Sequence, residues 1–268
     1  IVREDMGKFH AEVQSKMLVM PLEHYSNTNY ADIELNYTSL MKIVASSAEL
    51  DAIETAAFTA GAGSATDVNN DMSTLYGSNL RDTANNSGNA NPSYLDSQVD
   101  FGTTYDAGDV RALTLTLINS TLQSLRTNGG TPKCILTGYD TIQSIADLLQ
   151  SQERFMERKE IVPTHNGVRG VKGREVGFRV ATYFDIPLIP AKDMPSTGLA
   201  TGKLSDLLFL DTDHLWMAVM KPTQYFEDGI NSGNPFGVGA LGNKAMFRTM
   251  GETGCTFFKG QGKITNVN

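Results

Sequence analysis

The most constraining feature of the sequence is a long amphipathic stretch that begins at Asp32. Its apolar residues recur every three or four positions, at Ile33, Tyr37, Leu40, Met41, Val44, Ala48, Ala52 and Ala56. Polar residues fill the opposite positions, at Asp32, Asn36, Ser39, Ser47 and Asp51. This period predicts one long helix with a buried stripe and a hydrated face. Gly61 and Gly63 predict where the helix ends.

Two further helices are predicted in the middle of the chain. The first has Asp106 as its expected N-cap, and Asn128-Gly129-Gly130 marks its end. Its apolar stripe is Leu115, Ile118, Leu122 and Leu125. The second follows a short apolar strand at 134–136 and a turn at 137–140, and its stripe is Ile142, Ile145, Leu148 and Leu149.

Strands are predicted where apolar residues alternate with polar ones or form short runs. Residues 8–20 alternate at Phe9, Ala11 and Val13 and predict an extended segment. Two strands are expected on either side of Asp185, with Pro187 and Pro190 restricting that pair to a sheet edge. Further strands are expected at 207–210 and 215–220, joined as a hairpin by residues 211–214, and at 245–249 and 255–259. Helices and strands interleave irregularly, so the predicted fold class is α+β.

Two polar segments are predicted to be loops. Residues 64–105 are rich in Asn, Ser, Asp, Gly and Thr, and loops of such length are usually functional or mobile. Residues 153–175 carry six basic side chains, at Arg154, Arg158, Lys159, Arg169, Lys172 and Arg174, interspersed with Glu153, Glu157, Glu160 and Glu175. The mixed charge favours a solvated or interface loop over a DNA-facing patch.

Candidate sites for chemistry are few, and each has a plainer interpretation. Gly237-x-Gly239-x-x-Gly242 matches a dinucleotide fingerprint as a string, but no strand precedes it and no helix follows it, which favours a loop. Asp211, Asp213 and His214 could bind a cation or act as an acid/base set, although aspartates between two apolar strands are typical turn formers.

The remaining candidates are single residues scattered along the chain. His10, His24, His165 and His214 share no metal-ligand spacing. Trp216 and Phe257-Phe258 lack the interleaved cations of a base-stacking platform, so they are interpreted as core or subunit-contact residues. Cys134 and Cys255 lie outside any CxxC motif and are expected to be free thiols in a reducing compartment. The sequence therefore predicts no catalytic residue, no cofactor-binding residue and no metal ligand.

Charge and hydropathy exclude further classes of protein. The formal net charge is −8 and Lys and Arg form no block, which excludes strong general attraction to nucleic acid. No apolar run of membrane-spanning length occurs, and the first ten residues contain no apolar signal core, so an unexported, soluble protein is expected. P-loop, HExxH and GxSxG motifs are absent, and an enzyme is not expected.

Taken in order, these segments resemble the major capsid protein family of tailed bacteriophages and prophages, whose fold encapsulins share. Residues 8–27 (KFHAEVQSKMLVMPLEHYSN) are similar to the returning strand of that fold's extended loop, and residues 29–61 to its spine helix. The segments DVRALTLTLINSTLQSL and GGTPKCILTGYDTIQSIADLLQ are similar to the helix, strand and helix of its axial domain. VATYFDIPLIPAKDMP, LLFLDTDHLWMAVMKPTQYFE and MFRTMGETGCTFFKGQGKITNV resemble the segments that follow.

The resemblance implies a division of the chain into four parts. Residues 1–60 would be the end of the extended loop and the spine helix, within the peripheral domain. Residues 61–105 would be a polar insert or loop, and residues 106–215 mainly the axial domain. Residues 216–268 would be the return strands of the peripheral domain and the C-terminal segment. The outgoing half of the extended loop has no counterpart before Phe9.

The resemblance also implies function and partners. Copies of the chain would form hexamers and pentamers of an icosahedral shell around double-stranded phage DNA, assembled in the host bacterial cytoplasm and present in the virion. Scaffold, portal and decoration proteins would be further partners, contact with packaged DNA would be weak and non-specific, and no membrane would be involved. An encapsulin-like shell around a protein cargo is the alternative, and a nucleotide-binding or hydrolytic enzyme built on Gly237 or Asp211 is a more distant one.

Overall fold

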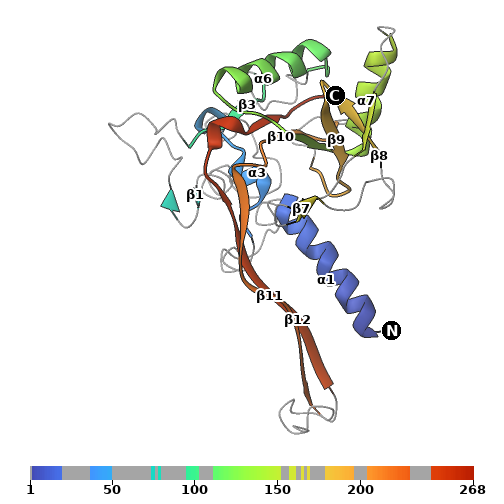
Figure 1. Cartoon of the computed structure of the whole chain (residues 1–268), viewed down its shortest axis with the longest axis vertical. Coiled ribbons are helices and arrows are strands. Elements are labelled where there is room, and N and C mark those ends of the chain that lie inside the picture. Colours follow the sequence, from blue (N-terminus) through green and yellow to red (C-terminus); the bar gives the residue numbers. More distant parts are fainter. Residues whose placement is uncertain are drawn as a thin grey trace, which may run out of the picture.

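A seven-stranded mixed sheet organises the body of the computed structural model, and a long two-stranded ribbon projects from that body (Figure 1). The structure describes residues 2–19, 37–49, 74–75, 78–79, 95–102, 111–151, 157–160, 164–165, 168–169, 179–195, 204–229 and 243–268. Both helices and strands are present throughout these ranges, which confirms the mixed α+β class.

The central sheet is built from strands that are distant in sequence. Its order is β3 (Gln98–Asp100), β13 (Gly262–Ile264), β10 (Leu207–Leu210), β4 (Cys134–Thr137), β9 (Ile186–Pro190), β8 (Arg179–Tyr183) and β5 (Glu157–Glu160). The β3–β13 and β4–β9 pairs are parallel, and the other pairs are antiparallel. The C-terminal strand β13 therefore joins β3, which comes from the segment expected to be a polar loop.

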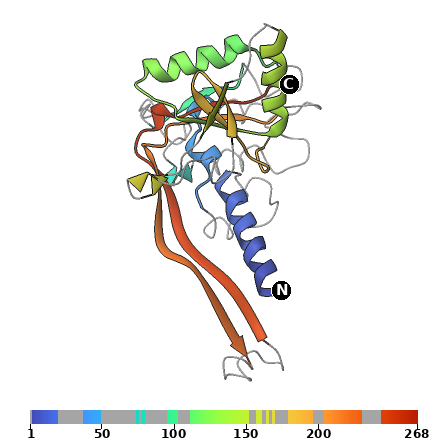
Figure 2. The same cartoon turned by 45° about the vertical axis from the view of Figure 1, so that its right-hand side comes forward.

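Alternate residues of the sheet enter two different cores, because successive strand side chains point to opposite faces. In β10, Leu207 and Phe209 pack on one face and Leu208 and Leu210 on the other, so the whole strand is buried. The first face is covered by helices α6 (Leu115–Thr127) and α7 (Tyr139–Ser151) (Figure 2). The second is covered by the short helix α3 (Leu40–Ile43) together with Leu75, Leu95 and Met194.

The helices over the first face follow the predicted apolar stripes closely. Leu115, Ile118, Leu122 and Leu125 of α6 are all buried, as are Ile145 and Leu149 of α7. The predicted cap of α6 is wrong, because the helix begins after Thr114, whose side chain accepts a hydrogen bond from the Leu117 N–H at 3.2 Å. Arg111 already pairs with Val267 in an extended bridge, so helix cannot reach back to Asp106.

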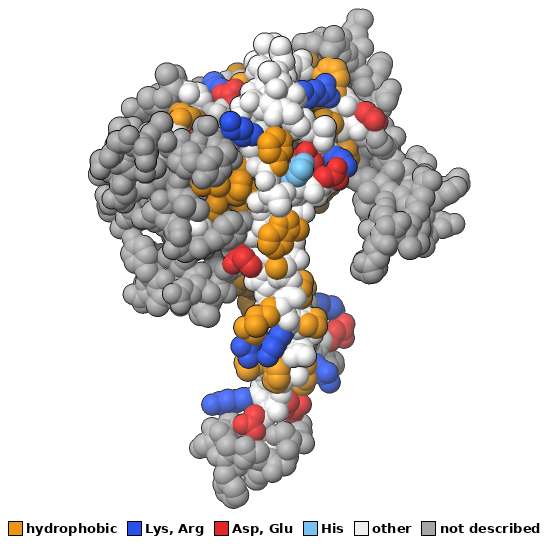
Figure 3. Space-filling view, turned by 60° about the vertical axis from the view of Figure 1, so that its left-hand side comes forward, with side chains coloured by type: hydrophobic (Ala, Val, Ile, Leu, Met, Phe, Trp, Pro, Cys, Tyr) orange, Lys and Arg blue, Asp and Glu red, His pale blue; other side chains and the backbone are white. Residues whose placement is uncertain are grey.

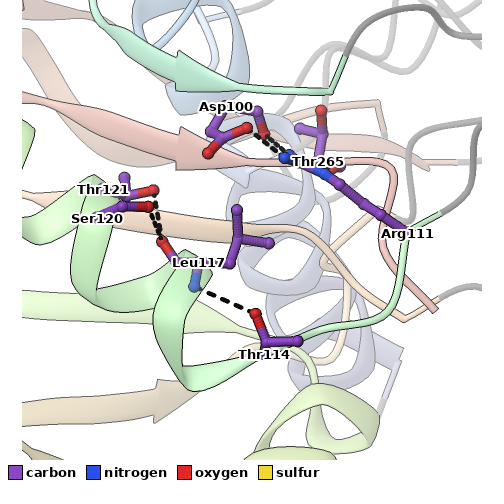
Figure 4. Close-up of polar contacts among 7 residues, drawn as sticks. All are labelled: Asp100, Arg111, Thr114, Leu117, Ser120, Thr121 and Thr265. Carbon is purple, nitrogen blue, oxygen red and sulfur yellow. Dashed lines mark hydrogen bonds and ion pairs between the residues drawn. The ribbon is translucent and has the colours of Figure 1, made fainter.

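Arg111 connects the last residues of the chain to the body through hydrogen bonds (Figure 4). Its guanidinium donates to the Asp100 carboxylate, to the Asp100 carbonyl at 2.5 Å and to the Thr265 carbonyl at 3.5 Å. Its backbone N–H donates to the Asn266 carbonyl, and its carbonyl accepts from the Asn268 N–H. One side chain thus ties β3, the C-terminal segment and the approach to α6 together.

Strand β13 also carries one partner of a buried ion pair. The Lys263 ammonium in β13 is 2.7 Å from a Glu49 carboxylate oxygen, and the two side chains are 0% and 1% exposed. The Glu49 backbone N–H is fixed by the Ser46 hydroxyl at 3.2 Å. Because neither charge meets water, each depends on the other for solvation.

The N-terminal segment is a helix, so the predicted extended strand is wrong. Helix α1 spans Val2–Val19, with Glu4 and Asp5 in its first turn and Lys16 in its last, a distribution that complements the helix dipole. A Glu4–Lys8 pair at 2.8 Å adds an i,i+4 contact. The alternation at Phe9, Ala11 and Val13 covers only three positions, whereas helical spacing extends through the whole segment.

The long helix predicted from Asp32 is also not present as one piece. Within residues 37–49, α3 ends at Ile43, residues 44–46 are not helical, and a new helical turn is formed by residues 47–49. Residues 41–46 are all buried, the polar Lys42 and Ser46 included, so this part of the segment has no hydrated face. The Ser97 N–H donates a hydrogen bond to the Ala45 carbonyl, and the Ser97 hydroxyl donates one to the Ile43 carbonyl. These two carbonyls are therefore not used in helical hydrogen bonds. Residues 50–60 and the glycines at 61 and 63 lie outside the described residues.

The predicted hairpin of residues 207–220 is replaced by a different pairing. Strand β10 pairs with β13 and β4, whereas β11 (Leu215–Gly229) pairs with β12 (Asn243–Cys255) to form the projecting ribbon. Four fully buried residues cannot share a two-stranded hairpin with nine consecutive exposed ones, 216–224. Residues 245–249 are a strand as predicted, but 258–260 form a 3-10 turn (η2), so the strand predicted at 255–259 is wrong.

Other sequence predictions need smaller corrections. Strands β8 and β9 flank the expected turn, where Phe184 and Asp185 both have positive φ (49° and 65°), as in a two-residue hairpin turn. However, β9 lies inside the sheet, between β4 and β8, and is not an edge strand. It tolerates both prolines because Pro187 lies at the end of its ladder with β8 and Pro190 at the end of its ladder with β4. The polar segments also contain strands: β1 (Thr74–Leu75), β2 (Ser78–Asn79) and β3 in the first, and β5, β6 (Thr164–His165) and β7 (Val168–Arg169) in the second.

Candidate assembly surface

The ribbon exposes most of the large hydrophobic side chains that the body leaves uncovered. Among the residues that the structure describes, six of the nine exposed large hydrophobic ones lie on it, namely Trp216, Met217, Val219, Met220, Phe226 and Met246. Figure 3 shows hydrophobic side chains along this stem, with Lys and Arg beside them toward its far end. Exposed apolar clusters of this kind mark surfaces that another molecule covers. An isolated two-stranded ribbon is moreover only marginally stable in water.

Helix α1 covers one face of the ribbon. The Arg3 guanidinium lies 4.0 Å from the centroid of the Tyr225 ring, and the Gly7 backbone approaches the Phe247 ring. The His10 ring stacks on Phe247 with centroids 5.8 Å apart, and its Nε2 lies 2.9 Å from the Thr249 hydroxyl. Positions 3, 7 and 10 share one side of a helix, so α1 lies along the ribbon face that carries Tyr225 and Phe247.

The opposite face of the ribbon is open to solvent among the described residues. Phe226 pairs with Met246, one position away from the Tyr225–Phe247 pair that meets α1. Because strand side chains alternate between faces, Phe226 and Met246 point away from α1, and they are 43% and 56% exposed. Arg248 and Lys244 flank Met246 on the same face and are both exposed.

The base of the ribbon is held by polar contacts centred on Asp211. Its carboxylate accepts from the Thr131 N–H at 3.0 Å, the Thr131 hydroxyl at 3.1 Å and the Asp213 N–H at 3.3 Å. Its backbone exchanges hydrogen bonds with the Gln261 side chain at 2.9 and 3.1 Å. Asp211 is 1% exposed, so it acts as a buried turn former that directs the chain from β10 into the ribbon.

The other two members of the predicted acid/base set point elsewhere. Asp213 forms an exposed ion pair with Lys133. The His214 ring packs edge-on against Phe257 at 5.3 Å, with Nδ1 3.2 Å from the Thr256 hydroxyl. Each of the three side chains thus has its own structural partner. Among the described residues, no group of three or more His, Cys, Asp or Glu side chains could hold a metal ion.

The predicted aromatic contact residues fall into two environments. Phe258 is buried in the second core, whereas Trp216 is 52% exposed on the ribbon. The indole of Trp216 lies against its cross-strand partner Gly254, where a Cβ would come within 2.3 Å of the ring. Because Gly254 has no side chain, the Trp216 ring can cover the backbone of both strands. The interpretation of these aromatics as core or contact residues is thus compatible with both positions.

Both cysteines are free thiols, as predicted, and Cys134 lies in a partly buried position on β4. Burial raises the pKa of the Cys134 thiol to about 11. The thiol therefore stays protonated and unreactive near neutral pH.

Several predicted candidates fall outside the described residues. The glycine motif at Gly237, Gly239 and Gly242 lies in the segment between β11 and β12, and His24 lies between α1 and α3. Arg154, Lys172 and Arg174 also lie outside, whereas Arg158 and Lys159 pair with β8 as part of β5. Arg169 pairs with Thr164 in the two-stranded β6–β7 sheet. Within the described residues, no helix is both long and apolar enough to cross a membrane.

Comparison with known families decides the class of the protein. The family model of the SU10 major capsid protein matches residues 30–233, which is more than half of the chain. The chain belongs to the SU10 major capsid protein family. It is therefore a structural phage capsid protein, and the expected resemblance to phage major capsid proteins is confirmed. The matched stretch includes β11, whereas α1 and β12 lie outside it.

Other comparisons add little to this family assignment. No curated protein matches the chain. Among solved structures, the chain is similar to the holo-SrpI encapsulin complex from Synechococcus elongatus PCC 7942, with 13% sequence identity and a TM-score of 0.39. That match covers 68% of this chain and 56% of the encapsulin chain.

The ribbon is the feature that sequence reasoning missed. The alternation of Thr223, Tyr225 and Glu227 extends the predicted strand past Met220, and the Gly- and Asn-rich segment 229–243 has the composition of a turn. These two signals together would have paired residues 215–229 with 243–255. The apolar run 207–210 obscured them, because it is the nearer apparent partner in sequence.

Proposed function

We propose that the chain is the head protein of an icosahedral phage shell, built from hexamers and pentamers around double-stranded DNA. The carrying observation is the projecting ribbon with its exposed apolar side chains, in a member of a capsid protein family. A shell subunit needs contacts that reach beyond its own body, and the ribbon and α1 extend away from the sheet. Copies of the chain are the partners that the ribbon fits best.

For the finer organisation we propose the division of the chain that the sequence led us to expect. Residues 106–215, with the central sheet, α6 and α7, would form most of the axial domain, and β3 and β13 connect residues 61–105 and 216–268 to the same sheet. Residues 1–60 and 216–268, which contain α1 and the ribbon, would form the peripheral domain. We propose the phage capsid fold on this basis, with scaffold, portal and decoration proteins as further partners and assembly in the host cytoplasm.

Contact with packaged DNA is expected to be weak and the protein to lack enzymatic activity. The net charge of −8 disfavours tight binding to a polyanion. Asp211, Asp213 and His214 are committed to structural contacts, which leaves this set without a free acid or base near a nucleophile. An encapsulin-like shell with protein cargo remains the second candidate, because it would use the same self-association.

Self-association can be measured with the purified chain. The single tryptophan of the sequence, Trp216, is half exposed on the ribbon and reports its environment. We expect sedimentation velocity to show multimers at rising concentration and the Trp216 emission to shift to shorter wavelength in parallel. A chain that stays monomeric with unchanged emission would contradict the proposal. Nucleic acid, rather than protein cargo, inside particles isolated from the native host would separate a phage head from an encapsulin-like compartment.

A further inference from the structure

The outer face of α1 presents an aromatic side chain between two acidic ones. Asp5, Phe9 and Glu12 lie on the side of the helix opposite Arg3, Gly7 and His10, which face the ribbon. Phe9 is 68% exposed, and Asp5 and Glu12 are also exposed. Glu12 makes a 2.6 Å ion pair with Lys192, and both side chains are more than half exposed, so its carboxylate remains accessible to another cation.

The open face of the ribbon presents the complementary pattern. Met246 and Phe226 form an apolar centre, and Arg248 and Lys244 stand on either side of it. The acid on this face, Asp228, lies directly opposite Lys244 across the ribbon and accepts a hydrogen bond from the Gly229 N–H at 2.9 Å. Along β12 the order is therefore cation, apolar residue, cation, where α1 presents acid, aromatic residue, acid.

The two patterns also have similar lengths. Seven helical steps from Asp5 to Glu12 span about 10 Å at the usual helical rise. Four strand steps from Arg248 to Lys244 span about 14 Å. Flexible Lys and Arg side chains readily cover that difference, so Phe9 can reach the apolar pair while both acids meet cations.

We propose that the open ribbon face of one copy docks on the outer face of α1 of a second copy. This inference rests on the proposed self-assembly and names the surfaces that carry it. Each α1 would then lie between its own ribbon and that of a neighbour. The two surfaces differ, so the contact is heterologous, and repeating it builds rings or larger assemblies instead of closed pairs.

Charge reversal with complementation tests the pairing directly. One variant carries Lys244→Glu and Arg248→Glu, and the other carries Asp5→Lys and Glu12→Lys. Each alone places like charges in contact, so we expect each to lose self-association in sedimentation velocity. An equimolar mixture restores opposite charges at every contact, so we expect multimers to return. The control variant, Arg126→Glu with Lys133→Glu, changes two cations of the body and should associate like the unmodified chain.

The outcomes separate this inference from the proposed function. If the unmodified chain stays monomeric, the proposed function fails. If it associates and either reversed variant does too, the docking surface is elsewhere. If the Asp5/Glu12 variant associates and the Lys244/Arg248 variant does not, the ribbons contact one another and α1 takes no part.

Cysteine cross-linking gives a second measurement that does not depend on charge. Phe9→Cys and Met246→Cys are made separately in a Cys134→Ser, Cys255→Ser background, mixed and oxidised. We expect a disulfide-linked pair that contains one copy of each variant, because a disulfide requires close approach of the two chains. Absence of this pair under conditions where the chains associate would overturn the inference.

Discussion

At the residue scale, the buried ion pair of Lys263 and Glu49 is the most demanding feature of the fold. The sequence shows a lysine in an alternating strand and a glutamate in an apolar segment, which normally predicts two exposed side chains. Only the fold shows that β13 lies inside the sheet and that residues 45–49 close over it. The pairing could not be predicted because the partners are more than 200 positions apart in sequence.

Removal of one partner of this pair should destabilise the protein strongly. Lys263→Met leaves a buried carboxylate without its cation, and we expect a loss of about 3–5 kcal/mol in the free energy of unfolding. Lys133→Met breaks the exposed pair with Asp213 and should cost no more than about 1 kcal/mol. Urea unfolding measures both, and Lys263→Met with Glu49→Leu should recover most of the loss. Equal costs for the two single variants would contradict the buried pair.

The Cys134 thiol provides a pH test at the same scale. Its pKa is raised from 9.0 to about 11, so its thiolate fraction at pH 8 should be about 100-fold below that of an ordinary thiol. We expect alkylation of Cys134 by iodoacetamide, followed by peptide mass spectrometry, to keep accelerating from pH 8 to pH 10. A rate that levels off near pH 9 would show that the thiol is not shielded.

The same shift predicts a loss of stability in base. The unfolded chain releases this proton near pH 9, whereas the folded chain keeps it until about pH 11. The contribution of the protonated thiol is therefore complete below pH 9 and is lost as pH rises through that interval. Cys134→Ser should flatten this part of the stability profile in urea unfolding, and an unchanged slope would refute the assignment.

At the element scale, the elements that the sequence predicted well are those whose burial is local. The stripes of α6 and α7 each face one side of one sheet, so the helical period is visible directly. Residues 41–46 are buried on all sides, so no hydrated face marks where the helix within segment 37–49 ends. In α1 the short alternation at Phe9, Ala11 and Val13 obscured the helical spacing of the whole segment. The ribbon was missed because the apolar run 207–210 is nearer in sequence and was taken as the partner of β11 in place of β12.

The N-cap of α6 can be tested with a matched pair of threonines. Thr114→Ala removes the acceptor for the Leu117 N–H and should cost about 1 kcal/mol. Thr116→Ala, at an exposed position inside the same helix, should be neutral or slightly stabilising. Thermal unfolding of both variants checks the helix boundary, and a costly Thr116→Ala with a neutral Thr114→Ala would place the cap elsewhere.

Two glycines, one on the ribbon and one on α1, test how side chains pack on the ribbon. Gly254→Ala would push a methyl group into the Trp216 ring, so we expect a lower melting temperature and a changed tryptophan emission. Gly7→Ala in α1 meets Phe247 at 3.6 Å, an ordinary contact, and should stabilise the helix by up to about 1 kcal/mol. An unchanged emission in Gly254→Ala would mean that the ring does not lie on that strand.

At the scale of the whole molecule, the function was more accessible from the sequence than the fold. The order of segments identified a phage capsid protein, and the family match confirms it. The assignments of individual segments within that order were less secure, since the expected N-terminal strand is helix α1 and the expected long helix is interrupted within residues 37–49. A capsid assignment depends on the overall order, whereas docking surfaces depend on which faces stay exposed, and only coordinates show those.

The most direct measurement is an electron cryomicroscopy map of the shell assembled from copies of this chain. We expect β11 and β12 of every copy to lie against a neighbouring copy, with Phe226 and Met246 covered by a helix that carries Phe9. A map in which subunits meet through the sheet bodies alone, with the ribbon exposed to solvent, would contradict it.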